Sequence, residues 1–154
     1  MSYAGIRDAL VTRVQAVSGI GNVWPRFRWF LDDVDSAAFA TIAVVNDYVN
    51  VWFISRTDSD DIQPSDSESA WRRRHEMIIV GFFSVHDADN TEGIFQVLVD
   101  AIRDNLRTGD RTLGGACLTY SLTKAQGIGF ETYGPSPILC HTVTIKLTVE
   151  EVLS

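Results

Sequence analysis

The residues of this chain best suited to acid–base chemistry or metal binding are its three histidines, His75, His86 and His141. A histidine titrates near neutral pH and is a common metal ligand. His75 and His141 lie in strand-like segments, beside Glu76 and Cys140 respectively. Because neighbouring side chains of a strand point to opposite faces, neither pair can chelate one ion. We therefore expect no metal site at either histidine.

The acidic residues offer no better catalytic centre. His86, Asp87 and Asp89 could in principle hold a metal, but they directly precede a helical pattern, where aspartates are expected as caps. Asp32–Asp33 and Asp60–Asp61 lie in turn-like or loop-like surroundings, where nothing would raise a carboxyl pKa by burial. The chain also lacks a G-x-S-x-G elbow and a complete glycine-rich phosphate motif. The sequence thus predicts no enzyme, no metal site and no cofactor; an enzyme would need a convergent polar site around one of the histidines.

The most distinctive stretch is TDSDDIQPSDSESAWRRRHE, residues 57–76, in which five acids precede a tryptophan and three arginines. Its flanks are rich in β-branched and aromatic residues, so we interpret it as a long, solvated hairpin loop at about 57–75 with a basic root. In one alternative, the arginines only balance the neighbouring acids where a solvated strand starts. In the other, acids and arginines meet across a subunit boundary, where charge complementarity sets register and partner choice. The second alternative predicts a subunit interface at Trp71, Arg72, Arg73, Arg74, Asp58, Asp60 and Asp61.

Two helices are predicted, one on each side of this loop in the sequence. Apolar residues recur every three or four positions in 3–18, which is typical of an amphipathic helix. The second helix has a broader apolar stripe; it is predicted to start at a capping box formed by Asp89 and Glu92 and to end near Gly109.

For three strands the sequence also predicts which face is buried. Residues 76–85 are apolar on both faces, which is typical of a central strand. Residues 116–123 and 139–149 alternate with period two, so one face is apolar and the other is rich in hydroxyl groups.

The segments before the charged loop are harder to assign. Residues 22–36 contain a proline and are interpreted as an extended edge segment. Residues 39–45 favour a strand, although a buried helical turn also fits so short a run. With Asn46 and Asp47 as the turn, they would form a hairpin with 48–56.

The order of these elements predicts a single α+β domain over residues 1–154. We expect an antiparallel sheet, with mixed pairing allowed, of about four or more strands and with both helices packed on its apolar face. The opposite, hydroxyl-rich face would be left uncovered by this chain.

Composition narrows the function. Twenty acids against 13 bases give a net charge of −7, which argues against general nucleic-acid binding. Two cysteines are too few for a disulfide framework. No apolar run approaches the length of about 20 residues that crosses a bilayer, and the charged N-terminus is unlike a signal peptide. We expect a soluble protein, without a membrane partner, made in a cytoplasm.

Five features in order carry a resemblance of layout: the segment IRDALVTRV, VWPR at 23–26, a strand pair linked by a long charged loop, TEGIFQVLVDAIRDNL, and CHTVTIKLTVEEVL. With these features the chain resembles the tail terminator proteins of long-tailed bacteriophages, also described as tail completion or head–tail joining proteins, and related prophage minor tail proteins. The resemblance spans most of the chain.

The resemblance implies a structural virion protein of the tail or neck, assembled in the host cytoplasm. Such proteins have a small α+β fold and no enzymatic activity. They form a ring, commonly a hexamer, that caps the tail tube and joins it to the head connector. Partners would be further copies of itself, the tail tube protein and a head-completion or connector protein. DNA would pass through the lumen without specific binding. From the acidic loop we expect an acidic lumen, which would keep DNA from sticking. The alternative is a small-ligand-binding or regulatory α+β domain without catalysis, using the hydroxyl-rich face.

Overall fold

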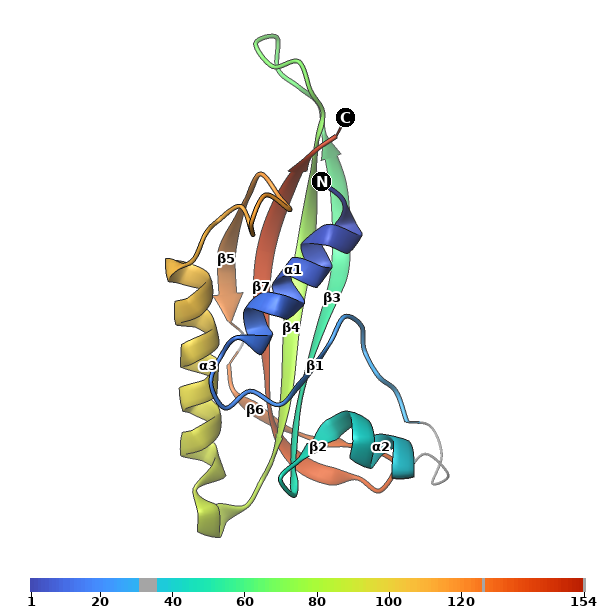
Figure 1. Cartoon of the computed structure of the whole chain (residues 1–154), viewed down its shortest axis with the longest axis vertical. Helices are drawn as coiled ribbons and strands as arrows, with labels where there is room; N and C mark the ends of the chain where they lie inside the picture. The colour runs from blue at the N-terminus through green and yellow to red at the C-terminus, as the bar shows by residue number, and fades with distance from the viewer. Residues whose placement is uncertain (31–35, 126, 154) are drawn as a thin grey trace.

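The computed structural model describes residues 1–30, 36–125 and 127–153 of the chain. They form one long, twisted sheet with helices against both faces (Figure 1). No helix in this part of the chain is long and apolar enough to span a membrane. The elements run in the order α1 (Tyr3–Gln15), β1 (Asn22–Trp24), α2 (Ser36–Ala43), β2 (Val44–Val45), β3 (Tyr48–Ile62), β4 (Arg72–Ser84), the short 3-10 helix η2 (Asp87–Asp89), α3 (Thr91–Thr108), β5 (Thr119–Ala125), β6 (Gly129–Tyr133) and β7 (Ile138–Val152).

In the described residues the sheet has seven strands in the order β1-β3-β4-β7-β5, with β2 beside β3 and β6 beside β7. All pairs are antiparallel except β1 with β3. Strand β4 lies at the centre, between β3 and β7, which explains why it is apolar on both faces. The predicted α+β fold with a mostly antiparallel sheet is confirmed.

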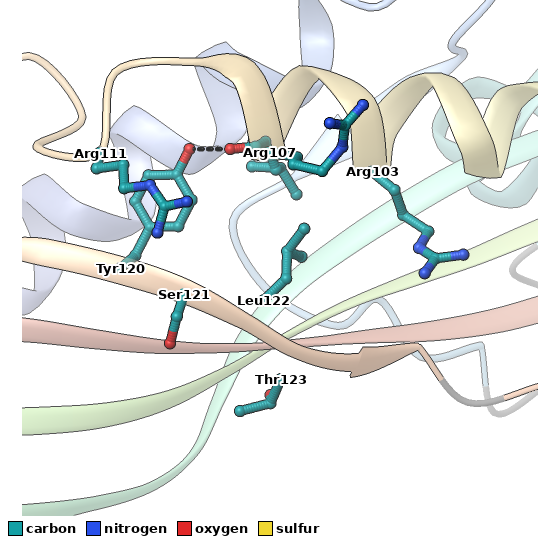
Figure 2. Close-up of a pocket in the computed structure, with 8 residues that line it drawn as sticks. Arg103, Arg107, Arg111, Tyr120, Ser121, Leu122 and Thr123 are labelled. Carbon is teal, nitrogen blue, oxygen red and sulfur yellow. Dashed lines mark hydrogen bonds between the residues drawn. The ribbon is translucent and has the colours of Figure 1, made fainter.

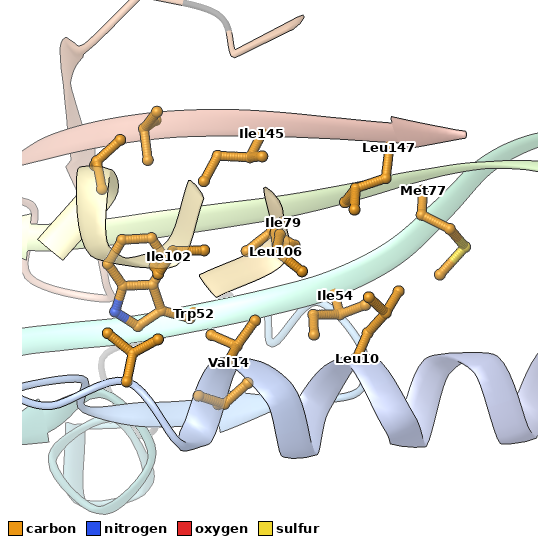
Figure 3. Close-up of a cluster of buried hydrophobic side chains, with 14 of the residues drawn as sticks. Leu10, Val14, Trp52, Ile54, Met77, Ile79, Ile102, Leu106, Ile145 and Leu147 are labelled. Atoms are coloured by element: carbon orange, nitrogen blue, oxygen red, sulfur yellow. The ribbon is translucent and has the colours of Figure 1, made fainter. Parts of the chain in front are cut away.

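Helices α1 and α3 cover one face of the sheet and enclose the main core with it (Figures 1 and 3). α1 begins after Ser2, whose hydroxyl accepts a hydrogen bond from the backbone N–H of Gly5 at 3.1 Å, a favoured N-cap. Burying one leucine or isoleucine side chain stabilises a fold by about 1.5–3 kcal/mol. The fully buried aliphatic and aromatic residues of this layer include Ile6, Leu10, Trp52, Ile54, Met77, Ile79, Phe95, Ile102, Ile145 and Leu147.

The opposite face is not left bare, and in this respect the prediction was wrong. Helix α2 and the segment after β1 cover the half of that face nearest β2 and β6, and form a second, mainly aromatic core. In this core the rings of Phe82 and Tyr133 stack with centroids 4.5 Å apart, and Phe30 meets Phe39 edge-on at 5.1 Å. The half of the face nearest the β3–β4 loop keeps its polar residues.

Helix α2 occupies most of the segment 39–45 for which a strand was favoured, so the helical alternative is the correct one. Its sequence, SAAFATIA, contains four alanines, the residue with the highest helix propensity. Asn46 and Asp47 form the predicted turn between β2 and β3. Both have positive φ, 50° and 67°, as in the hairpin turn that matches strand twist.

Two short strands were not predicted as strands. β1 is the start of the segment 22–36, in agreement with the extended conformation expected there. Residues 31–35, which include Asp32–Asp33, lie outside the described residues. β6 pairs with residues 138–142 of β7, whose other half pairs with β5.

The predicted capping box of α3 was wrong. The helix starts after Asn90, which has a left-handed backbone (φ 53°) and makes no capping bond through its side chain. The carboxylate of Asp89 instead accepts a hydrogen bond from the hydroxyl of Tyr48. The end of the helix at Gly109 is confirmed.

Candidate functional site

The tip of the β3–β4 hairpin projects beyond the rest of the sheet (Figure 1). β3 continues to Ile62 and β4 starts at Arg72, so the connecting loop spans 63–71. The loop predicted at about 57–75 was therefore too long. We call residues 57–71 the arm: they comprise the outer end of β3, whose far edge pairs with no described residue, and the projecting loop.

The strands extend this far because their charges are complementary. Asp61 lies opposite Arg73, and Asp60 lies opposite Arg74. Oppositely charged residues facing each other across an antiparallel pair stabilise it, and an uncharged polar stretch would lack this contribution. A bulge between Arg56 and residue 58 precedes the charged pairs.

The three arginines all find acidic partners within the chain. Arg73 binds Asp61 through two hydrogen bonds, of 2.6 and 3.1 Å, on the face that carries α1 and α3. Arg72 and Arg74 lie on the opposite face and share Glu150, at 3.2 and 3.3 Å. These contacts balance the arginine charge at the arm's root, which is the first of the two alternatives; a role in subunit contact stays a prediction.

The bidentate pair shifts the titration of both members. The hydrogen bond from Arg73 holds the pKa of Asp61 below its usual value, and that bond raises the pKa of Arg73. Both side chains are well exposed to solvent, so the pair orients the arm more than it stabilises the fold.

The other predicted interface residues remain open to solvent. Trp71 is 46% exposed, while its carbonyl accepts a hydrogen bond from the Leu153 N–H at 2.9 Å and so fixes its backbone. Asp58 and Asp60 are exposed, and neither forms an ion pair with any residue that the structure describes. The structure thus brings Asp61 to the arginines and leaves Trp71, Asp58 and Asp60 facing solvent.

A polar network at the arm's root, in which His75 and Glu151 are buried and Arg56 is exposed, was missed by sequence reasoning. His75 Nε2 lies 2.9 Å from Glu151 Oε1, and Arg56 Nη1 lies 3.4 Å from His75 Nδ1. The guanidinium of Arg56 also lies 4.3 Å over the ring of Tyr3 in α1. Since Arg56 can only donate, Nδ1 accepts and Nε2 carries the proton that Glu151 accepts. His75 and Glu151 keep the alternate spacing of the buried positions in β4 and β7, a signal that could have revealed them.

A second basic cluster lies between α3 and β5, along the sheet edge formed by β5. The cavity measures about 340 Å³, and we call it the arginine groove. Figure 2 shows the arginines on the helix side and the aromatic and apolar side chains rising from the strand. Its principal lining residues are Arg103, Arg107, Arg111, Tyr120 and Leu122. The sequence interpretation overlooked it, although arginines recurring every four residues were a usable signal.

A larger groove of about 640 Å³, which we call the aromatic groove, lies on the opposite sheet face, beside β6. Aromatic rings form one part of its wall, and threonine hydroxyls of β7 form another. Trp29, at its rim, is 73% exposed. The lining residues include Phe27, Trp29, Phe82, Tyr133, Thr142 and Thr144.

Of the remaining candidates for chemistry, His141, Cys117 and Cys140 are buried, whereas His86 is exposed. His141 Nε2 lies 3.0 Å from the Thr91 hydroxyl, and burial lowers the pKa of this histidine. Burial raises the thiol pKa of Cys117 to about 11 and that of Cys140 to about 12, so both are protonated, unreactive thiols at neutral pH. As expected, His141 and Cys140 pack on opposite faces. Within the described ranges, no group of three or more histidine, cysteine or acidic residues could hold a metal ion.

No protein-family model matches the sequence, and no curated protein matches it significantly. The surfaces of the molecule therefore carry the functional argument: the arm, the arginine groove and the aromatic groove.

Proposed function

We propose that this chain is the subunit of a bacteriophage tail terminator ring, which caps the tail tube and joins it to the head connector. The observation that carries the proposal is the arm, which projects from the sheet with Trp71 half-exposed at its base. A ring needs two different patches on each subunit, in head-to-tail contact. A projecting arm supplies one patch, and the body of the neighbouring subunit supplies the other. The layout resemblance of the sequence points to the same class of protein.

In this proposal the subunit acts by shape and charge, without catalysis or a cofactor. The interface includes Trp71, Arg72, Arg73, Arg74, Asp58, Asp60 and Asp61. The intrachain pairs of the arginines orient the arm, while Trp71 offers the exposed aromatic surface that interface hot spots favour. Other copies of the chain, the tail tube protein and the head-completion or connector protein are its partners.

The net charge of −7 on each copy supports a passive role toward DNA. A ring of such subunits would repel a polyanion from its lumen, so DNA would pass without specific binding. The ring is assembled in the host cytoplasm and becomes part of the tail or neck of the virion.

The decisive experiment combines light scattering after size exclusion with negative-stain microscopy of the purified full chain. A ring about as wide as a tail tube is the expected result. The variant Trp71→Ser should stay folded by circular dichroism and should fail to form the ring. A wild-type protein that stays monomeric at the highest concentration reached would overturn the proposal.

A second candidate function has one specific observation in its favour. The aromatic groove has the size and mixed lining of a small-molecule site, with rings for contact and hydroxyls for orientation. A stable monomer that binds a small aromatic or sugar-like ligand saturably, with quenching of Trp29 fluorescence, would support a small-ligand-binding or regulatory domain instead.

A further inference from the structure

The basic residues of this chain differ in whether their charge is already matched. The arginines at the arm's root all bind acids of the same chain. In the arginine groove, by contrast, Arg103 and Arg111 form no ion pair with any described residue, and Arg107 meets only Asp104, at 3.0 Å. The groove therefore gathers two arginines without an ion pair among the described residues, and a third paired only with its helix neighbour, on an otherwise acidic molecule.

The groove is built on fixed elements. Tyr120 is buried, and its hydroxyl donates a hydrogen bond to the carbonyl of Leu106, which ties β5 to the end of α3 (Figure 2). A neighbouring hollow of about 310 Å³ extends the groove along the helix toward Asp100 and Asp104. The excess of positive charge consequently lies at the Arg111 end. Because β5 is the last strand of the sheet among the described residues, a segment lying in the groove would also meet a strand edge without a partner.

The arm holds the matching negative charge. Asp61 and Glu68 bind arginines of their own chain, the latter at 3.5 Å from Arg72. Asp58, Asp60 and Asp66 are exposed, and none of them forms an ion pair within the described residues. In Figure 1 the arm projects from one end of the molecule, while α3 and β5 lie along its side. The two surfaces therefore face different directions in one copy.

We propose that the acidic arm of one copy binds in the arginine groove of the next copy, with Asp58, Asp60 and Asp66 opposite Arg103, Arg107 and Arg111. The inference rests on the proposed ring and names the contact that closes it. The two surfaces are different, so the contact is head-to-tail and generates a ring when the rotation closes. Arginine pairs with carboxylates in a directional, two-pronged geometry, which fixes the register between neighbours.

A second copy fits the groove better than a nucleic acid does. Phosphate binding requires a surplus of basic charge over an extended surface, whereas the net charge here is −7 and the groove offers three arginines with two aspartates at one end. The arm, in contrast, carries a few exposed acids on a hairpin that projects from the body.

The test uses two full-length variants of opposite design. The groove variant carries Arg103→Glu and Arg111→Glu; the arm variant carries Asp58→Lys and Asp66→Lys. All four side chains are exposed, so both variants should keep the wild-type melting curve and circular dichroism. Arg7→Glu with Arg26→Glu makes the same change in net charge as the groove variant, away from both surfaces, and serves as its control.

Assembly is measured by light scattering across a concentration series at low and at high salt. Each variant alone should need a concentration about tenfold higher or more for half-assembly, since like charges would then face each other. The wild-type ring should weaken with salt, because exposed charges are screened. Mixing the two variants should restore assembly, since lysines of one arm then meet glutamates of the other groove, in an alternating ring.

The outcomes distinguish the arm–groove contact from the ring function on which it rests. If the wild type forms a ring and both variants form it equally well, the arm–groove contact is overturned while the ring function stands. A wild-type monomer overturns both. If the groove variant assembles normally but loses binding to a short DNA duplex, the groove is a nucleic-acid site instead. Loss of assembly in both variants without recovery on mixing also contradicts the proposal.

Discussion

His75 and Glu151 form a buried hydrogen bond at the root of the arm, with Nε2 2.9 Å from Oε1 and side-chain exposed fractions of 0% and 4%. The bond joins β4 to β7 one step inside the exposed pair of Arg73 with Asp61. A fully bonded buried polar pair is sensitive to register, because a slip of one residue would leave both groups without a partner. The arm is thus anchored to the sheet by a polar contact.

Replacing Glu151 by alanine should destabilise the protein by about 1–3 kcal/mol, because His75 would be left buried without its acceptor. Urea unfolding followed by circular dichroism measures this change. Glu151→Gln keeps an acceptor oxygen and should cost less. Glu131→Ala, at an exposed position, is the matched control and should have little effect. Equal stability of the alanine variant and the wild type would contradict the structural role of this bond.

The pair of Asp61 with Arg73 gives a pH-dependent signal. Arg73 lowers the pKa of Asp61 below 3.8, so the folded state binds a proton there less readily than the unfolded state. The contribution to stability is therefore present above pH 3.8 and is lost as the pH falls through the lowered folded value. NMR titration of the Asp61 carboxyl should show the low pKa in the wild type. In Arg73→Gln the pKa should return toward 3.8; an unchanged value would show that another group causes the shift.

The parts of this fold that could be predicted are those where one periodicity dominates. The apolar stripes of α1 and α3 and the two apolar faces of β4 each have one consistent interpretation. Helix α2 is only eight residues long, so its pattern also fits a strand, and β1 and β6 are too short to show any period. Their positions are set by the aromatic core around Phe82, which involves contacts distant in sequence.

The sequence could predict which charged residues the site contains but not which of them form ion pairs. The sequence shows that acids and arginines are close along the chain, and β3 and β4 do bring Asp61 to Arg73. It does not show that Glu150, from a strand almost eighty residues away, would satisfy both Arg72 and Arg74. Nor does it show that Arg103, Arg107 and Arg111 would line one groove together with β5.

His141 should make stability fall in mildly acidic solution. Burial lowers its pKa below 6.5, against the opposing influence of Glu92, so protonation favours the unfolded chain. This effect is absent well above pH 6.5; it grows as the pH falls below that value and levels off below the folded pKa. In His141→Gln the stability curve between pH 7 and pH 5, roughly the window set by a histidine, should be flatter. The same slope in both proteins would contradict the assignment to His141.

The close contact between Gly81 in β4 and Trp52 in β3 can be tested with a single methyl group. A Cβ on Gly81 would lie 2.2 Å from the Trp52 ring, a distance that requires the buried indole to move. Trp52 is fully buried, stacks on Phe95 at 5.8 Å and donates its indole N–H to Asn50 at 3.0 Å, so it has no free space. Gly81→Ala should therefore destabilise the protein by about 1–3 kcal/mol, the usual cost of overpacking a core.

Gly127→Ala is the matched control for this substitution, because a Cβ there would meet nothing within 4 Å. It should leave the unfolding midpoint nearly unchanged. In the double variant Gly81→Ala with Trp52→Phe, the phenylalanine ring is smaller than the indole and should relieve the clash. The double variant should therefore lose less stability than the two single variants lose together. Strict additivity of the three measurements would show that the indole does not limit the space at Gly81.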